Sequence, residues 1–349
     1  KTFVVVERIK KLVEQNVDED KILCVTFTEK ATEEMQNRLA DMGNMDTEVS
    51  TFHSFCKEVC EDHLLESGIS TDSKLLKETS LQVWCMQNSD RFGIDTNIIE
   101  MGKDNATLFK GIVQAISNFK ESLITSLEFQ TWLDEKSDEI NKMSGDERVN
   151  NAELIEYVKY HIEFNKVYAK YEKFQKDNGV YDFDDLIKNA IDLLKNNSLV
   201  LNSYTQKYKY ILVDEFQDNN FGQYELVRLL GQNGNVMVVG DDNQLVMRFQ
   251  GARQANFTEF KKQFANVQEY HITENFRSTK EIIGFANLFL ENIDDRIQKE
   301  NKTSRAGEKV KIVRPDKEDG QTEFIINTIR SLLGKEYVNK NGEKAKYGY

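Results

Sequence analysis

The chain has 349 residues, and its 46 lysines and arginines against 59 aspartates and glutamates give a net charge of −13. This length is enough for roughly two or three domains, and the acidic balance excludes a protein that coats nucleic acid by bulk charge, while leaving room for a local basic groove. No apolar stretch approaches the ~18–20 residues that span a bilayer, no signal-peptide pattern opens the chain, and four cysteines are too few for a disulfide scaffold. We therefore expect a cytoplasmic protein without a membrane segment.

The first forty residues alternate between helical and strand patterns. Val5 and Ile9 recur at helical spacing, which predicts a helix at the start of the chain. Residues 21–27 then form a short apolar run that predicts a buried strand. Residues 28–42 again show a helical pattern, which ends at Gly43.

The middle of the chain, residues 61–178, is long, charged and helical in pattern, with no strong strand signal. From residue 181 the alternation of strands and helices returns. Three further short apolar runs predict strands, at residues 208–213, 235–239 and 309–313. This layout predicts a parallel α/β sheet that is interrupted by an all-helical insertion.

Two of the predicted strands end in polar residues that suit nucleotide chemistry. Asp214 and Glu215 follow the strand at 208–213, at the strand end where open parallel sheets bind ligands. In P-loop NTPases an aspartate here helps to hold Mg²⁺, and an adjacent glutamate can accept a proton from water. Gln244 follows the next strand, and its amide suits the sensing of a phosphate. Taken alone, a strand ending in a solvated acidic turn is an equal alternative.

Two basic residues, Lys1 and Arg277, could bind the phosphates of a nucleotide. Lys1 and Thr2 precede a helix and a strand, as do the last residues of the phosphate-binding Gly-x-x-x-x-Gly-Lys-Thr loop. Because the chain begins with lysine, we expect it to be a piece of a longer protein with a glycine-rich loop before Lys1. Arg277 could reach a phosphate as an arginine finger, although most arginines are structural.

Other groupings are less specific. Cys56 and Cys60 lie one helical turn apart near His53 and His63, which admits a metal site. We favour small buried thiols, because closed metal sites need a second pair of cysteines or histidines. Lys120 is either a DNA contact or, as we favour, part of a solvated helix face.

Taken in order, these motifs resemble those of superfamily 1 DNA helicases of the UvrD/Rep/PcrA type. The resemblance extends from residue 1 to about residue 280, is weak after residue 300, and is specific because several independent motifs keep their order. The matching segments are the tail of motif I at 1–2, motif Ia at 26–38, motif Ib at 51–55, the Asp-Phe-Asp-Asp-Leu element at 182–186, motif II at 214–218, motif III at 240–252 and motif IV at 275–278.

The resemblance implies ATP and Mg²⁺ as cofactors and single-stranded DNA as a partner. It assigns phosphate binding or sensing to some residues, Mg²⁺ to others, and water activation to one. The implied nucleotide residues are Lys1 and Thr2 (phosphate loop), Thr2 and Asp214 (Mg²⁺), Glu215 (water), and Gln217, Gln244 and Arg277 (γ-phosphate). The implied DNA path is lined by Thr26, Phe27, Thr51, His53 and Phe249. An aromatic ring there can stack on any base, which permits movement that is independent of sequence.

The chain departs from the family pattern at two positions on the implied DNA path. Glu29 stands where the family usually has asparagine, and an acid there would repel phosphate. Met247 stands where the family usually has an aromatic residue, although methionine can still pack on a base. The glycines of the phosphate loop and the later motifs V and VI are absent. We therefore expect this chain to be inactive as an ATPase on its own.

The resemblance implies a RecA-like P-loop NTPase domain formed by residues 1–75 and 178–277, with a helical insertion subdomain at 76–177. Residues 278–349 would begin a second RecA-like domain. The implied function is that of an ATP-dependent helicase moving 3′→5′ on single-stranded DNA and at junctions with duplex, in DNA repair or replication restart. Two alternatives stay open, which are a motor subunit of a RecB/AddA-like helicase–nuclease and a non-catalytic nucleotide-switch or DNA-binding module.

Overall fold

The computed structural model describes residues 1–43, 47–69, 72–94, 105–241, 255–291, 301–314, 318–338 and 344–347. The chain divides into two compact units, residues 1–268 and residues 269–349. The first unit contains the sheet and the helical middle of the chain. Residues 242–254, and with them Gln244, Met247 and Phe249, lie outside the described residues.

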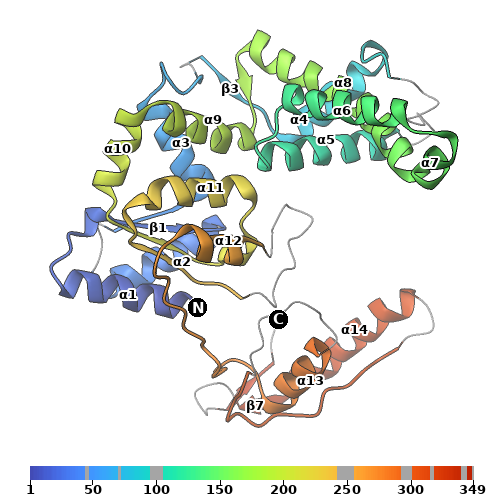
Figure 1. The fold of residues 1–349 in the computed structure, drawn as a ribbon. Coiled ribbons are helices and arrows are strands. Elements are labelled where there is room, and N and C mark those ends of the chain that lie inside the picture. Colours follow the sequence, from blue (N-terminus) through green and yellow to red (C-terminus); the bar gives the residue numbers. More distant parts are fainter. Residues whose placement is uncertain are drawn as a thin grey trace. The chain divides into compact units, whose positions relative to one another are not determined.

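The first unit is built on a four-stranded parallel sheet with the strand order β2-β1-β5-β6 (Figure 1). The register pairs Thr26 with Thr51 and Val25 with Val213, so the carboxyl ends of neighbouring strands meet at one edge. Every residue of β1 is buried, as expected for a central strand of a parallel sheet. The strands are β1 Ile22–Thr26, β2 Glu48–Thr51, β5 Tyr210–Val213 and β6 Val236–Val238.

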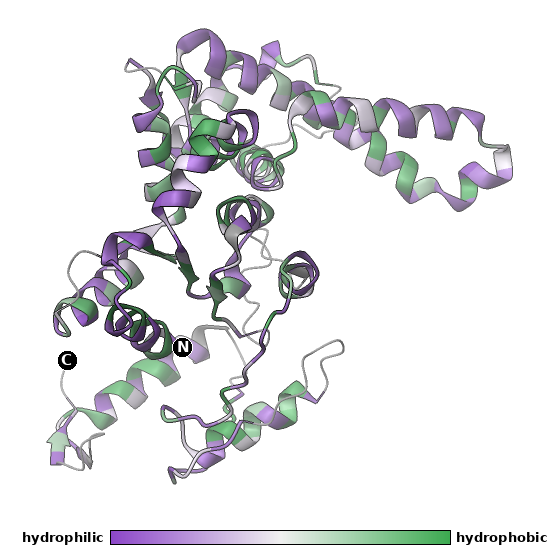
Figure 2. Cartoon of the chain, turned by 60° about the vertical axis from the view of Figure 1, so that its left-hand side comes forward, coloured by the Kyte–Doolittle hydropathy of each residue, from purple (hydrophilic) through white to green (hydrophobic). Residues whose placement is uncertain are grey.

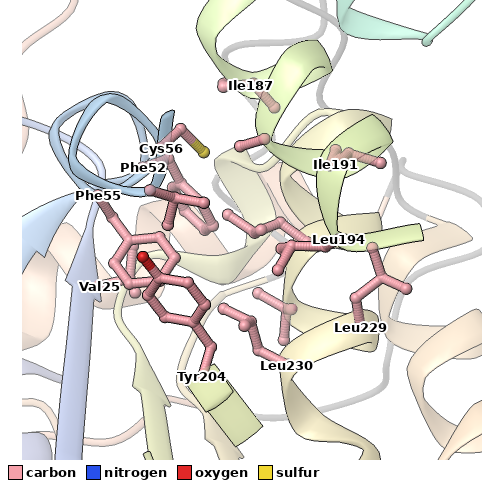
Figure 3. Packing of buried hydrophobic residues seen from close by; sticks show 14 of the residues in the cluster. Val25, Phe52, Phe55, Cys56, Ile187, Ile191, Leu194, Tyr204, Leu229 and Leu230 are labelled. Carbon is pink, nitrogen blue, oxygen red and sulfur yellow. The ribbon is translucent and has the colours of Figure 1, made fainter. Parts of the chain in front are cut away.

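Helices cover both faces of this sheet, because alternate side chains of β1 point to opposite sides. Cys24 packs with residues of α1 and α2, whereas Leu23 and Val25 belong to a larger cluster on the other face. Figure 3 shows this larger cluster, in which side chains of α3, α9 and α11 meet above the strands. The helices are α1 Thr2–Glu14, α2 Glu29–Ala40, α3 Phe52–Asp62, α9 Phe183–Asn196, α10 Ser198–Lys207, α11 Phe221–Leu230 and α12 Ala255–Gln263.

The helical middle of the chain leaves and rejoins the sheet region at one place. Its two ends are short parallel strands that pair with each other, β3 Lys74–Leu75 and β4 Val180–Tyr181. Its helices have a hydrophobic core of their own, and Figure 2 shows hydrophobic and hydrophilic residues mixed along them. They are α4 Glu78–Gln87, α5 Asn105–Glu121, α6 Ser126–Lys142, α7 Gly145–Asn150 and α8 Ala152–Asn178.

Lys120 ties this helical region to the sheet region, and the prediction that it contacts DNA or lies on a solvated face is wrong. Its side chain is 2% exposed, and its Nζ donates to Asp182 at 2.7 Å, to Asp185 at 2.6 Å and to Gln175 at 3.0 Å. Burial alone would lower the pKa of Lys120, but the two carboxylates outweigh it and raise that pKa above its ordinary value. Charge neutralisation at the start of α9 therefore explains why a lysine is buried here.

In its described residues, the second unit contains two helices and a hairpin. The prediction of a strand at residues 309–313 is wrong, because this segment is irregular and does not pair with a strand in the described residues. Ile312 is 81% exposed, so the apolar run is not buried as a strand interior would be. The elements are α13 Lys280–Leu290, α14 Glu318–Leu332, β7 Glu336–Val338 and β8 Lys344–Lys346. No helix in the described part of the chain is both long and apolar enough to cross a membrane.

Candidate functional site

The start of α1 meets the end of β5 at the carboxyl edge of the sheet. The side chain of Lys1 forms an ion pair with Glu215. The hydroxyl of Thr2 donates a hydrogen bond to Asp214 Oδ2 at 3.0 Å. More than two hundred residues separate the partners along the chain. The fold therefore brings together four side chains that we had selected from the sequence for one chemistry.

The backbone at Glu215 explains how this meeting arises. Glu215 has φ +51° and ψ +41°, which is the left-handed conformation and is uncommon for a residue other than glycine. It costs roughly 1 kcal/mol. This conformation turns the chain sharply from β5 into the 3₁₀ helix Phe216–Asp218, so the glutamate lies at the tip of the turn. Unusual backbone of this kind is a frequent property of functional sites.

Gln217 links this turn to the next strand of the sheet. It is 1% exposed, its Nε2 donates to Glu215 Oε2 at 2.8 Å, and its Oε1 accepts from the N–H of Asp241 at 2.9 Å. An added Cβ at Gly240 would lie 2.7 Å from Phe257 Cζ and 2.8 Å from Gln217 Oε1, so a larger residue there would require these side chains to move. The polar turn after β6 thus reaches the Glu215 turn, as the parallel arrangement predicts.

The electrostatics of Asp214 suit a cation. Asp214 is 3% exposed. Burial raises the pKa of its carboxyl group, and the hydrogen bond from Thr2 counteracts this rise. Hydroxyl and carboxylate oxygens are the ligands that Mg²⁺ accepts in proteins, and it takes few of them when phosphates and water supply the rest. No group of three or more His, Cys, Asp or Glu residues in the described segments is arranged to hold a metal without such help.

A second feature lies at the same edge, where β1 and β2 end. It is a cavity of about 660 Å³. All but one of its lining residues are polar or charged, and they come from α2, β2 and the start of α3. The lining residues are Glu29, Lys30, Thr32, Glu33, Gln36, Val49, Ser50, Thr51 and Ser54.

Of the residues predicted to line a DNA path, Thr51 lines this cavity and Thr26 contacts another of its lining residues, Thr32. Thr26 is fully buried, and its hydroxyl lies 2.6 Å from that of Thr32. Thr51 caps α3, accepting from the N–H of Ser54 at 3.1 Å, while Phe27 and His53 are partly buried beside the strand ends. Burial of Thr26 fits a supporting position rather than one in contact with a ligand.

Two features near His53 were not anticipated from the sequence. Burial lowers the pKa of His53, and the charge of Glu29 partly counteracts this. The His53 ring also packs edge-to-face on Phe183, with 6.1 Å between ring centroids, and Phe183 is 50% exposed. The sequence did contain a signal for Phe183, because an aromatic residue directly after the N-cap Asp182 stands at the start of a helix and faces outward.

The remaining predicted residues are more isolated. Cys56 and Cys60 are fully buried in the core, so the interpretation as structural thiols is confirmed. Arg277 is exposed in the second unit, where its N–H donates to Asn275 Oδ1 at 2.9 Å and its carbonyl accepts from Arg305. Its approach to the Asp214–Glu215 turn stays a prediction.

The first helix of this parallel sheet begins with Lys-Thr, and the Asp-Glu turn that it contacts follows strand β5. This combination defines the RecA-like class of P-loop NTPase domains. Family comparison agrees and is more specific. The model for the UvrD/REP helicase N-terminal domain matches residues 1–265, and the model for the UvrD-like helicase C-terminal domain matches residues 270–346. The chain belongs to the UvrD/Rep family of helicases.

Similar curated proteins come from several bacteria. The ATP-dependent DNA helicase PcrA of Bacillus subtilis is 32% identical over 340 residues, covering 95% of this chain and 42% of that protein. A probable DNA helicase II homolog of Mycoplasma capricolum is 30% identical, with 98% and 44% covered. DNA helicase II of Haemophilus influenzae is 28% identical, with 95% and 43% covered. The chain thus spans less than half the length of these relatives.

Proposed function

We propose that the full-length protein is an ATP-dependent helicase that moves 3′→5′ along single-stranded DNA and opens duplex at junctions. The observation that carries the proposal is the meeting of Lys1 and Thr2 with Asp214 and Glu215 at one sheet edge. The similarity to PcrA, an ATP-dependent DNA helicase, and to two proteins of the DNA helicase II type supports it. We place its action in the bacterial cytoplasm, in DNA repair or replication restart.

The side chains divide the work of ATP hydrolysis between them. Lys1 and the first N–H groups of α1 bind the β- and γ-phosphates, where the helix dipole favours negative charge. To reach a phosphate, Lys1 leaves its ion pair, and this frees the Glu215 carboxylate to accept a proton from the attacking water. Thr2 and Asp214 would hold Mg²⁺, which would supply positive charge to neutralise the phosphates.

The same sheet connects hydrolysis to movement on DNA. Strand β1 pairs with β5, which carries Asp214, and on its other side with β2, which ends at Thr51. Neighbouring strands lie about 4.8 Å apart, so the nucleotide residues and the cavity at β2 are separated by a single strand. Gln217 and Gln244 respond to the γ-phosphate, and Arg277 completes the site when the second motor domain closes. Opening after hydrolysis then releases one base from its stacking residue.

The decisive test is Glu215→Gln in the full-length protein. We expect DNA-stimulated ATPase to fall at least about a hundredfold, because general-base catalysis is lost. ATP binding should be unchanged or tighter, because Lys1 is no longer held by a carboxylate. Glu14→Gln, at the exposed far end of α1, is the matched control and should keep full activity. Equal ATPase rates in Glu215→Gln and the wild type would contradict the assignment and favour a non-catalytic switch.

The direction of movement is tested with partial duplexes. We expect the protein to unwind a duplex that carries a single-stranded 3′ tail and to leave one with a 5′ tail intact. Unwinding from the 5′ tail alone would contradict the proposed polarity. Release of nucleotides from the same substrates would instead favour a helicase–nuclease.

A further inference from the structure

Glu29 is an exposed residue whose carboxylate accepts hydrogen bonds from two hydroxyl groups. Its Oε1 accepts hydrogen bonds from Thr51 Oγ1 at 3.2 Å and from Ser54 Oγ at 3.1 Å. All three residues line the 660 Å³ cavity at the ends of β1 and β2. Glu29 begins α2, Thr51 ends β2 and Ser54 lies in the first turn of α3, so the carboxylate connects three elements.

This arrangement is one that would bind a phosphate oxygen. Serine and threonine hydroxyls together with a helix N-terminus are common ligands of nucleic-acid phosphates. Thr51 is the N-cap of α3, and Ser54 donates its hydroxyl from the first turn of that helix. The Glu29 carboxylate resembles a phosphate in charge and in its acceptor oxygens. It therefore satisfies from within the protein the donors that a DNA backbone would use.

We propose that Glu29 is an internal competitor for single-stranded DNA, whose carboxylate must leave Thr51 and Ser54 before a backbone phosphate can bind them. This inference rests on the function proposed above. Glu29 lowers the affinity for single-stranded DNA and speeds its release, because DNA binding replaces the carboxylate by a phosphate at the same two hydroxyl donors. It acts at the β2 end of the edge, apart from Lys1 and Glu215.

A simpler explanation is that an acidic residue near DNA only repels it through charge. Glu33 separates the two explanations, because it lies on the same helix, lines the same cavity and is exposed. In the described part of the chain, its carboxylate makes no hydrogen bond with the hydroxyls that Glu29 holds. Removing Glu33 changes the charge of the cavity by the same amount without releasing either hydroxyl.

The first experiment measures binding of a fluorescent oligothymidylate to the full-length protein and its variants. Glu29→Ala should tighten binding about tenfold, the size of one hydrogen bond to a charged group, whereas Glu33→Ala should tighten it about twofold or less. The difference between the two variants should persist at high salt, because screening removes distant repulsion and not a direct hydrogen bond. Equal gains in the two variants would overturn the competitor role.

A second substitution checks the donor. In the Glu29→Ala background, Ser54→Ala should remove most of the gain in affinity, because it deletes one of the released hydroxyls. Ser54 is exposed, so this change does not disturb the core. A gain that survives Ser54→Ala would contradict the proposed exchange at this hydroxyl.

A third measurement tests the geometry without DNA. The charge of Glu29 opposes the effect of burial on the pKa of His53, so Glu29→Ala should lower that pKa further in an NMR titration, and Glu33→Ala should not. Suppose that the pKa of His53 shifts in Glu29→Ala but that neither the wild type nor any variant binds DNA. This result would refute the proposed function and, with it, the competitor role of Glu29. DNA binding by the wild type with equal affinities for the two alanine variants would refute the competitor alone.

Discussion

Removal of Lys120 should destabilise the first unit strongly. This lysine is the cation between Asp182 and Asp185, and its loss leaves two carboxylates in a buried place without a counter-charge. We expect Lys120→Met to lower the free energy of unfolding by about 3–5 kcal/mol. The chain's two tryptophans, Trp84 and Trp132, lie in the helical region, so fluorescence in urea reports on it.

The control for this prediction is Lys110→Met, an exposed lysine on the same helix. It should change the unfolding midpoint little. If both variants unfold at the same urea concentration as the wild type, the buried ion pairs do not stabilise the junction. Partial recovery on adding Asp185→Asn would support the explanation by uncompensated charge.

Two carboxyl groups beside this junction predict how stability depends on pH. Burial, with a contribution from Asp184, raises the pKa of Glu121 to about 8, and burial, with a contribution from Asp182, raises the pKa of Asp184 to about 7. Between about pH 4.5 and these values the folded state keeps protons that the unfolded state releases. Stability should therefore fall as pH rises through this window, by up to about 1.4 kcal/mol per pH unit for each group.

The measurement is the urea midpoint at about pH 6 and about pH 8.5, with the midpoint lower at the higher pH. Glu121→Gln and Asp184→Asn should each flatten this dependence, since neither replacement titrates. Asp134→Asn, at an exposed position of α6, should leave it unchanged. A midpoint that rises with pH would contradict the raised pKa values.

At the level of elements, α6 offers a local test of helix capping. Thr125 and Glu128 form a capping box, in which the threonine hydroxyl accepts from the Glu128 N–H and the glutamate accepts from the Thr125 N–H. Thr125→Ala should cost about 1 kcal/mol in unfolding experiments that follow tryptophan fluorescence. Thr131→Ala, in the middle of the same helix, removes a hydroxyl without removing a cap. Equal losses in the two variants would show that the cap contributes nothing specific.

The sequence predicted those elements whose signal is local. β1, β5 and β6 are short apolar runs, a pattern typical of strands in a parallel sheet and visible without tertiary information. β2 was recognised as a motif rather than a strand, because Glu48–Thr51 is short and mostly polar. The run 309–313 has the strand pattern without a partner strand in the described residues, and pattern alone does not supply one.

The site shows the same division between local and distant information. Asp214 and Glu215 could be selected because they directly follow a strand. The ion pair from Lys1 and the link from Gln217 to Asp241 depend on how strands are ordered in the sheet. Lys120 was misjudged for this reason, since its carboxylate partners lie more than sixty residues away in sequence. A lysine on a charged helix looks solvated until those partners are known.

At the level of the whole molecule, the net charge of −13 predicts an unusual dependence of DNA binding on salt. Each backbone phosphate that a basic side chain neutralises contributes about −0.7 to the slope of log affinity against log salt concentration for single strands. The cavity at β1 and β2 has one basic residue in its lining, Lys30, beside the acids Glu29 and Glu33. Stacking of bases on aromatic rings, by contrast, does not release counterions.

We therefore expect a shallow slope, about −1 to −2, for oligothymidylate binding to the full-length protein. The matched probe is an abasic strand of the same length, which keeps the phosphates and lacks the bases. It should bind at least about tenfold more weakly, since each stacked base is worth ~1–3 kcal/mol. A steep slope, with equal affinity for the two strands, would mean that basic residues elsewhere in the protein hold the DNA by charge. In that case the acidic surface of this chain would face away from the strand, and the cavity at the ends of β1 and β2 would lose its proposed role.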